Sequence, residues 1–161
     1  MIHVRSAIAL DAPSMATLLN AIIDQGGTTA MTNQVSGADI ADWMRENDGK
    51  AAWHVALNDS ENVVGFQWIA PADYLPLEAA EIATFVQVGQ TGLGIGSKLF
   101  EATCKAAKAI GYKWINANIR CDNEGGLIYY QSRGFVDYGR IDGYKLESGQ
   151  HVDKVLKRFD V

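Results

Sequence analysis

The 161-residue sequence has no excess of basic charge, is poor in cysteine and contains no long apolar segment. Lysine and arginine together number 14 against 19 acidic residues, and the basic residues form no cluster. A protein whose main partner is nucleic acid or an anionic membrane needs a basic surface. A bilayer-spanning helix needs a run of about 20 apolar residues, and the sequence offers none. We therefore expect a protein that binds neither nucleic acid nor a membrane.

Cys104 and Cys121 are the two cysteines, and the three histidines are far apart in sequence. A Cys-x-x-Cys pair or a close set of cysteine and histidine would suggest zinc, and neither pattern occurs. Free thiols are typical of a reducing compartment. The first residues place His3, Arg5 and Asp11 among apolar ones, unlike the core of a signal peptide. These features predict a cytoplasmic protein without a metal.

Apolar residues make up 48% of the chain, which is enough for one hydrophobic core and too little for two. We expect a single domain over residues 1–161. Strands are predicted at residues 3–8, 51–58, 62–70, 81–88, 112–119, 135–146 and 151–161. Helices are predicted after the caps Asp11 and Ser36, from Ile95 to the stop Gly111, and from a cap at Asp122 or Asn123 to the stop Gly134. This order predicts an α/β (α+β) fold with a mixed, mostly antiparallel sheet and helices on both faces.

Three glycines, Gly92, Gly94 and Gly96, separate the strand over 81–88 from the helix that follows. Exposed amides and the positive end of a helix suit a phosphate or pyrophosphate at such a place. The dinucleotide fingerprint G-x-G-x-x-G fails because Ser97 occupies its third glycine position, and no Gly-Lys-Ser/Thr completes a phosphate-binding P-loop. An anion site and a plain structural turn both remain open at this point.

A second motif lies downstream, where Asn123 is followed by Tyr130 and by Gly134-Phe135. Together, TGLGIGSKLF and N…YYQSRGF resemble the acetyl-CoA-binding core of the GNAT N-acetyltransferase superfamily. The predicted element order resembles that fold over nearly the whole chain. AEIATFVQV, IRCDNEGG and GYKLESGQHVDKVLKRF further resemble the phosphinothricin and amino-acid N-acetyltransferase branch, which acetylates small primary amines.

The resemblance implies how acetyl-CoA would bind. Backbone amides in the glycine segment would hold the pyrophosphate, and the strand over 81–88 would splay from the strand over 112–119 to receive the thioester arm. Thr91 stands where the family usually has glutamine or arginine, which leaves the contacts to the backbone. The implied cofactor-binding residues are Phe85, Val86, Val88, Thr91, Gly92, Leu93, Gly94, Ile95, Gly96, Ser97, Lys98, Asn123, Gly126 and Tyr130.

Attack of an amine on a thioester needs a group that takes a proton and a group that gives one. The resemblance implies Glu81 as the base, usually acting through a water, with Glu78 three residues earlier as the competing carboxylate, and Tyr130 as the acid. Tyr129 is the rival acid, because adjacent helical residues point about 100° apart and one of the two tyrosines should pack in the core.

By analogy with the family, the acceptor pocket is formed by segments 26–34 and 68–76, which places Thr28, Thr29, Trp68 and Tyr74 near the amine. Residues 70–81 contain no arginine that could bind a carboxylate. Amino-acid-like, neutral and cationic acceptors therefore remain open.

These features predict an enzyme that moves an acetyl group from acetyl-CoA directly to the primary amine of a small molecule. A protein N-terminus or lysine is the alternative acceptor. The alternatives of another class are a catalytically inactive CoA-binding sensor and, weakened by its failed fingerprint, a nucleotide-binding oxidoreductase. Family analogy also implies a homodimer formed through the C-terminal strands.

Overall fold

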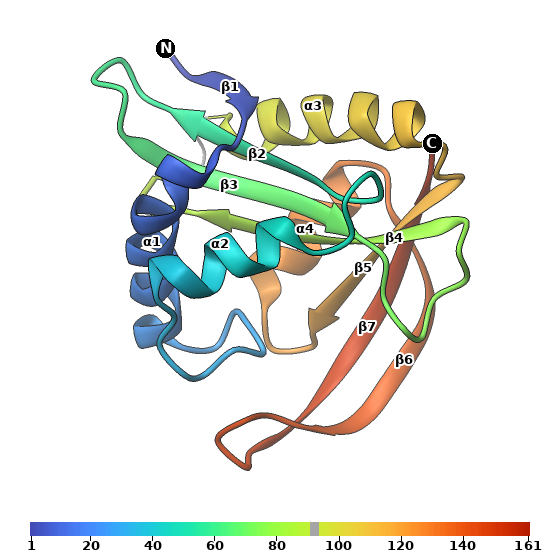
Figure 1. The fold of residues 1–161 in the computed structure, drawn as a ribbon. Coiled ribbons are helices and arrows are strands. Elements are labelled where there is room, and N and C mark those ends of the chain that lie inside the picture. Colours follow the sequence, from blue (N-terminus) through green and yellow to red (C-terminus); the bar gives the residue numbers. More distant parts are fainter. Residues whose placement is uncertain (91–93) are drawn as a thin grey trace.

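The computed structural model describes residues 1–90 and 94–161, and Figure 1 shows its fold. In these residues, seven strands form one sheet in the order β1-β2-β3-β4-β5-β7-β6. The strands are β1 (His3–Ser6), β2 (Ala52–Leu57), β3 (Val63–Ala70), β4 (Ala79–Val86), β5 (Trp114–Arg120), β6 (Val136–Lys145) and β7 (His151–Asp160). The helices are the short 3₁₀ helix η1 (Ala9–Asp11) and α1 (Ala12–Gln25), α2 (Gly37–Arg45), α3 (Ile95–Ile110) and α4 (Glu124–Ser132).

The sheet is mixed, because β4 and β5 run parallel while the other neighbouring strands run antiparallel. Helices α1 and α2 cover one face, and α3 and α4 cover the other (Figure 1). The predicted mostly antiparallel sheet with helices on both faces is therefore confirmed.

Each face of the sheet has its own apolar core. Met15, Leu19 and Phe66 are fully buried on the side of α1, and Ile115 is fully buried on the side of α3 and α4. Full burial of one such side chain stabilises a protein by about 1.5–3 kcal/mol. Apolar side chains at helical spacing therefore pack the helices against both faces of the sheet.

Strands β4 and β5 separate soon after they meet. Their paired register ends at Glu81 and Asn116, although β4 continues to Val86 and β5 continues to Arg120. Strand β5 stays paired with β7 along its whole length. The splay implied by the family resemblance is confirmed, and it leaves one edge of β4 open.

The open edge of β4 presents main-chain groups. The Gln87 amide donates to the Val64 carbonyl on β3 at 2.9 Å. Backbone groups alternate in direction along a strand, so the Val86 amide points to the opposite edge, which β5 has left. This amide is available to a ligand that lies along β4.

Most predicted helix ends are confirmed. The Ser36 hydroxyl accepts from the Asp39 amide, and Gly111 and Gly134 adopt positive φ angles of 107° and 103°. Asp11 is the exception, because its side chain does not cap α1. Its carboxylate instead accepts two hydrogen bonds from Arg5, at 2.8 and 2.9 Å.

Candidate active site

A cleft of about 1110 Å³ occupies the splay between β4 and β5 and continues to the beginnings of α3 and α4. It contains most of the residues that the sequence motifs indicate. Those that line it are Thr28, Thr29, Trp68, Glu81, Phe85, Val86, Val88, Gly94, Ile95, Gly96, Ser97, Asn123, Gly126 and Tyr130. Thr91, Gly92 and Leu93 lie outside the described residues.

Helix α3 begins with residues that line the cleft. Gly94 precedes it with a φ angle of 78°, a left-handed conformation that glycine adopts without strain. The Lys98 amide makes the first hydrogen bond of the helix, to the Gly94 carbonyl at 3.1 Å. The amides of Ile95, Gly96 and Ser97 precede that bond and have no partner inside the helix. The helix start therefore suits an anion.

Position 96 must be a glycine because the Tyr129 ring packs directly against its backbone. A Cβ at this position would lie 2.6 Å from Cε1 of Tyr129. The Tyr129 hydroxyl also donates to the Gly96 carbonyl at 2.7 Å. The bare backbone thus serves two purposes: a left-handed turn at Gly94 and close packing of Tyr129 at Gly96.

Lys98 is not among the described residues that line the cleft, and its predicted contact with the cofactor stays a prediction. Its Nζ donates to the Ile2 carbonyl at 3.1 Å, because the first turn of α3 points this side chain towards β1. Arg133 lies in the cleft instead, where its Nη1 donates to the Ser97 hydroxyl. Sequence reasoning missed Arg133, although the quoted YYQSRGF motif contains it.

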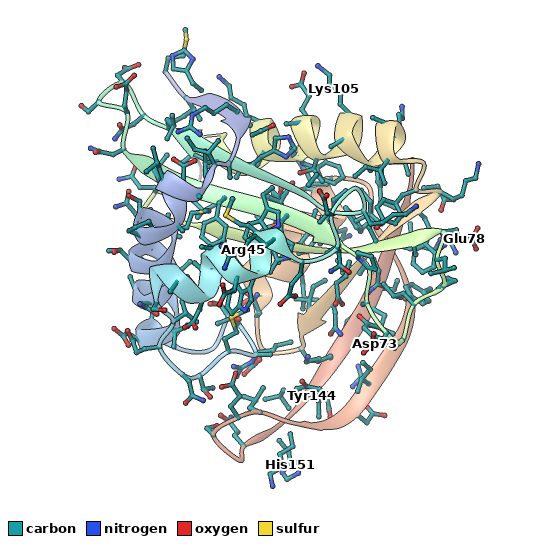
Figure 2. The ribbon with its side chains drawn as sticks, in the orientation of Figure 1. Arg45, Asp73, Glu78, Lys105, Tyr144 and His151 are labelled. Atoms are coloured by element: carbon teal, nitrogen blue, oxygen red, sulfur yellow. The ribbon has the colours of Figure 1, made fainter. Side chains whose placement is uncertain are left out.

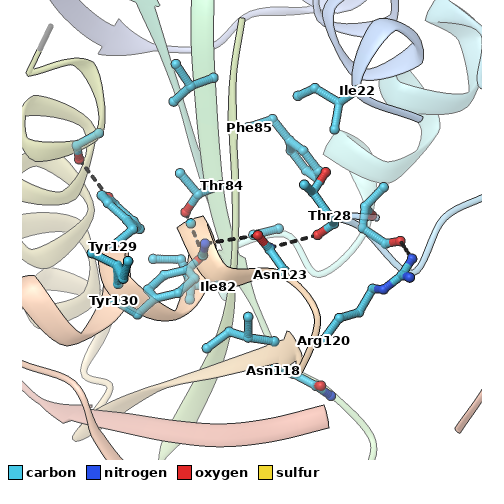
Figure 3. A pocket seen from close by; sticks show the side chains of 18 of the residues that line it. Ile22, Thr28, Ile82, Thr84, Phe85, Asn118, Arg120, Asn123, Tyr129 and Tyr130 are labelled. Atoms are coloured by element: carbon cyan, nitrogen blue, oxygen red, sulfur yellow. Dashed lines mark hydrogen bonds between the residues drawn. The ribbon is translucent and has the colours of Figure 1, made fainter. Parts of the chain in front are cut away.

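The two adjacent tyrosines of α4 have different hydrogen-bond partners. Tyr129 gives its hydrogen to Gly96 and accepts from Gln67 Nε2 at 3.2 Å. Burial raises the pKa of Tyr129 to about 12. The Tyr130 hydroxyl lies 2.8 Å from the Thr84 hydroxyl (Figure 3), and burial raises the pKa of Tyr130 well above its ordinary value. Both phenols are therefore protonated at neutral pH.

A buried polar chain supports Tyr130. Gln67 and Thr103 are both 0% exposed, and the Thr103 hydroxyl donates to Gln67 Oε1. Gln67 Nε2 in turn donates to the Thr84 hydroxyl at 2.8 Å. Sequence reasoning missed this chain, although a glutamine inside the apolar run NVVGFQWIA is a signal that could have indicated it.

Glu81 sits where the pairing of β4 and β5 ends. Its carboxylate accepts a hydrogen bond from the Tyr74 hydroxyl and lies 3.5 Å from Asn116 Nδ2. The Tyr74 oxygen accepts from the Asn116 and Asn118 amides at 2.9 and 3.1 Å. Burial, together with the hydrogen bond to Glu81, raises the pKa of Tyr74. Tyr74 is not among the described residues that line the cleft, but its hydroxyl contacts Glu81, which is, so its predicted place near the amine stays a prediction.

Main-chain carbonyls connect the 26–34 segment to the far side of the cleft. Asn123 Nδ2 donates to the Thr28 carbonyl at 3.0 Å, and Arg120 Nη1 donates to the Thr29 carbonyl at 2.9 Å (Figure 3). Asn123 Oδ1 also accepts from the Gly126 amide, which confirms the predicted cap of α4. A Cβ at Gly126 would collide with the Asn123 side chain, so the glycine there makes room for this cap.

The model of the acetyltransferase (GNAT) family matches residues 18–135. The chain belongs to the GNAT acetyltransferase family. The matched span holds both edges of the splay, the start of α3 and both tyrosines of α4. The family therefore accounts for the elements that form the cleft.

Two relatives of this GNAT chain match it over more than nine tenths of its length. YwnH of Bacillus subtilis (strain 168), provisionally named a phosphinothricin acetyltransferase, is 25% identical over 92% of this chain and 93% of its own. An L-methionine sulfoximine/L-methionine sulfone acetyltransferase of Pseudomonas paraeruginosa (strain DSM 24068 / PA7) is 24% identical over 98% of this chain and 94% of its own.

Solved structures show the same fold. A phosphinothricin acetyltransferase of the GNAT superfamily from Sinorhizobium meliloti, crystallised with AcCoA, superposes with a TM-score of 0.88 at 18% identity. The superposition covers 99% of this chain and 88% of that one. This likeness confirms the architecture implied by the sequence resemblance.

Two other features of this acetyltransferase concern metals and membranes. Among residues 1–90 and 94–161, no three histidine, cysteine, aspartate or glutamate side chains are grouped so that they could hold a metal ion. No helix in the described part of the chain is long and apolar enough to cross a membrane.

Proposed function

We propose that this GNAT acetyltransferase moves the acetyl group of acetyl-CoA to the primary amine of a small, amino-acid-like molecule or amine metabolite. One observation carries the proposal: the open edge of β4, the first residues of α3, Glu81 and Tyr130 all line one cleft. The names of both curated relatives support a small acceptor, since each names a small molecule that carries an amine.

The residues of the cleft fit acetyl-CoA. The amides of Ile95, Gly96 and Ser97, together with Arg133, would hold its pyrophosphate at the start of α3. The Val86 amide on the open edge of β4 would receive the thioester arm as a neighbouring strand does. When bound, acetyl-CoA supplies an acetyl group that is activated as a thioester.

Three groups of this chain would then perform the chemistry. Glu81 would take a proton from the amine, directly or through a water. The Val86 amide would stabilise negative charge on the acetyl oxygen. Tyr130, kept protonated by burial, would give a proton to the departing sulfur as the C–S bond breaks.

We further propose that transfer is direct, without a covalent enzyme intermediate. Neither Cys104 nor Cys121 is among the described residues that line the cleft. Burial raises the pKa of Cys104, which leaves its thiol a weak nucleophile.

We also propose one domain over residues 1–161, a cytoplasmic location and a homodimer. Strand β6 lies at the edge of the sheet and exposes Val136, Tyr138 and Tyr144. An edge strand offers unpaired backbone groups to a second strand, which supports self-association. Light scattering of the purified protein would measure its mass in solution.

Thermal melting with acetyl-CoA, CoA, NAD and ATP tests the cofactor. A ligand at 100 times its Kd stabilises a protein by about 2.7 kcal/mol, so acetyl-CoA and CoA should raise the Tm and the other two should not. Thiol release from acetyl-CoA across amino acids, polyamines and peptides then tests the acceptor. A shift with NAD alone would contradict the proposal, and a CoA shift without thiol release would indicate the sensor.

A further inference from the structure

A lysine lies in the acceptor part of the cleft. Lys154 on β7 lines the cleft and is only 6% exposed. It pairs in register with Arg120 of β5, so both side chains project from the same face of the sheet. The cleft therefore holds two cations next to the segment that contains Thr28 and Thr29.

The two cations differ in their hydrogen-bond and ion-pair partners. The Arg120 guanidinium donates to both carboxylate oxygens of Asp122, at 2.9 and 2.7 Å, and to the Thr29 carbonyl. In residues 1–90 and 94–161, by contrast, Lys154 Nζ has neither a carboxylate within 4.0 Å nor a hydrogen-bond acceptor. Its charge is instead 3.6 Å from the ring centre of Tyr144, on the β6–β7 hairpin (Figure 2).

A ring alone is poor compensation for the charge of a lysine whose side chain is largely buried and whose ammonium opens only into the cleft. An ammonium has three N–H donors, and its transfer out of water is costly without a charged or hydrogen-bonding partner. A cation–π contact offsets only a part of that cost. Burial lowers the pKa of Lys154, while the negative charge of Glu81 opposes this effect. Lys154 is therefore a positive group that lacks an anion.

The missing anion has a place in the proposed reaction. Glu81 and Lys154 line the same cleft, and the Glu81 charge acts on Lys154. Residues 70–81, which lead into β4, contain no arginine. A carboxylate on the acceptor would satisfy Lys154, and the amine of the same molecule would then be free to approach Glu81.

We propose that Lys154 binds the carboxylate of the acceptor, which makes amines that carry an acid group, such as amino acids, the substrate class. This inference rests on the proposed function. It excludes polyamines as preferred acceptors, because a buried ammonium repels a second cation.

Binding can be measured without turnover. Isothermal titration of the protein saturated with CoA would use L-methionine sulfone, phosphinothricin and the standard L-amino acids, each beside its carboxamide, which lacks the α-carboxylate charge. We expect at least one acid to bind more tightly than its carboxamide. In Lys154→Met the affinity for that acid should fall roughly tenfold to a hundredfold, the loss of a charge-assisted hydrogen bond, with the carboxamide unchanged. Lys154→Arg should restore part of the preference.

Lys157→Met is the matched control. Lys157 is also a buried lysine of β7, but it is paired with Asp137 and does not line the cleft. Its replacement should leave the preference for the acid intact. Melting scans of all variants would show that each is folded, and Lys154→Met should melt no lower than the unmodified protein, because it removes a charge without an anionic partner from a largely buried side chain.

The inference is overturned if no acid binds better than its carboxamide, or if Lys154→Met keeps the preference. Failure of the proposed function gives a different result: no amine is acetylated, whatever binds. Loss of acid binding in Lys154→Met would still support the anion subsite in that case.

Discussion

The Thr84 and Tyr130 hydroxyls face each other at 2.8 Å, across the gap between the open edge of β4 and helix α4. Gln67 Nε2 already donates to the Thr84 oxygen. Either hydroxyl can donate in this contact; when Thr84 donates to the Tyr130 oxygen, the hydrogen of Tyr130 is free to point into the cleft. Tyr129 has no such freedom, because its hydrogen is donated to the Gly96 carbonyl. The hydrogen-bond pattern therefore favours Tyr130 as the acid.

Thr84→Val should lower kcat roughly tenfold, because it removes the hydroxyl that orients Tyr130 while keeping the side-chain shape. The KM for acetyl-CoA should change little. Thr84→Ser should restore most of the rate, and steady-state kinetics of both variants measure the effect. Equal rates for Thr84→Val and the unmodified enzyme would show that Tyr130 needs no partner.

Tyr130→Phe should lower kcat by about 10²-fold, at the low end for lost acid catalysis, with little change in acetyl-CoA affinity. Tyr129→Phe is the control and should mainly reduce stability, since it removes the hydrogen bond to Gly96. Turnover and titration with acetyl-CoA separate the two effects. A full rate in Tyr130→Phe would move the acid to Tyr129 or to water.

Glu81→Gln should lower kcat/KM by about 10²–10⁴-fold if this carboxylate is the base. Tyr74→Phe should lower it roughly tenfold, because Glu81 then loses a charge-assisted hydrogen bond that fixes its orientation. Since Tyr74 acts through Glu81, its replacement in the Glu81→Gln background should cost less than it does alone. Fully additive losses would show that Tyr74 acts independently of Glu81.

Gly96→Ala should destabilise the protein by about 1–3 kcal/mol, because the added methyl group pushes against the Tyr129 ring. Gly125→Ala is the matched control: its Cβ would have 4.0 Å to the nearest atom, Asn123 Oδ1, and alanine is the better helix former. Urea denaturation of both variants measures the difference. Equal stability of the two would contradict the packing explanation for Gly96.

The Arg5–Asp11 pair predicts a stability that depends on pH. The Arg5 hydrogen bond holds the pKa of Asp11 below its ordinary value of about 3.9. The contribution of the Arg5–Asp11 pair to the free energy of unfolding is therefore complete above that ordinary pKa. It is lost as the pH falls through the lowered pKa of the folded state. Asp11→Asn should reduce the free energy of unfolding at pH 7 and have a smaller effect near pH 3.

Chemical denaturation at both pH values tests this prediction. Asp59→Asn is the control, because Asp59 pairs with the N-terminal amine in a fully exposed position and should contribute little. An Asp11→Asn effect that is equal at pH 7 and pH 3 would show that the ion pair is not its cause.

Local signals in the sequence correctly predicted where most helices begin or end. The hydrogen-bond partners of Ser36, Asn123 and Gly111 are backbone groups at most four residues away. Such partners can be predicted from the neighbouring sequence alone. The predicted cap at Asp11 does not form, because the carboxylate of Asp11 accepts hydrogen bonds from Arg5, on β1. Strand β4 also begins at Ala79, before the predicted residue 81, since its buried alanines pair with β5.

The site was only partly predictable, because some of its contacts join residues that are far apart in the sequence. Most residues that the glycine segment and the second motif indicated do line the cleft, but the majority of the described residues that line it carried no such signal. Thr84 and Lys154 carry no local signal, because their neighbours come from other elements: Tyr130 from α4 and Tyr144 from β6. Recognising them requires the strand order, in which β7 lies between β5 and β6.

The early separation of β4 from β5 bears on how such an enzyme diversifies. Every residue except proline carries a main-chain hydrogen like that of Val86, so most substitutions along that strand would leave the proposed binding of the thioester unchanged. The proposed acceptor side of the cleft depends on individual side chains such as Lys154, so a single replacement there would change which amine is accepted. One scaffold can therefore adopt new acceptors while its donor chemistry stays the same.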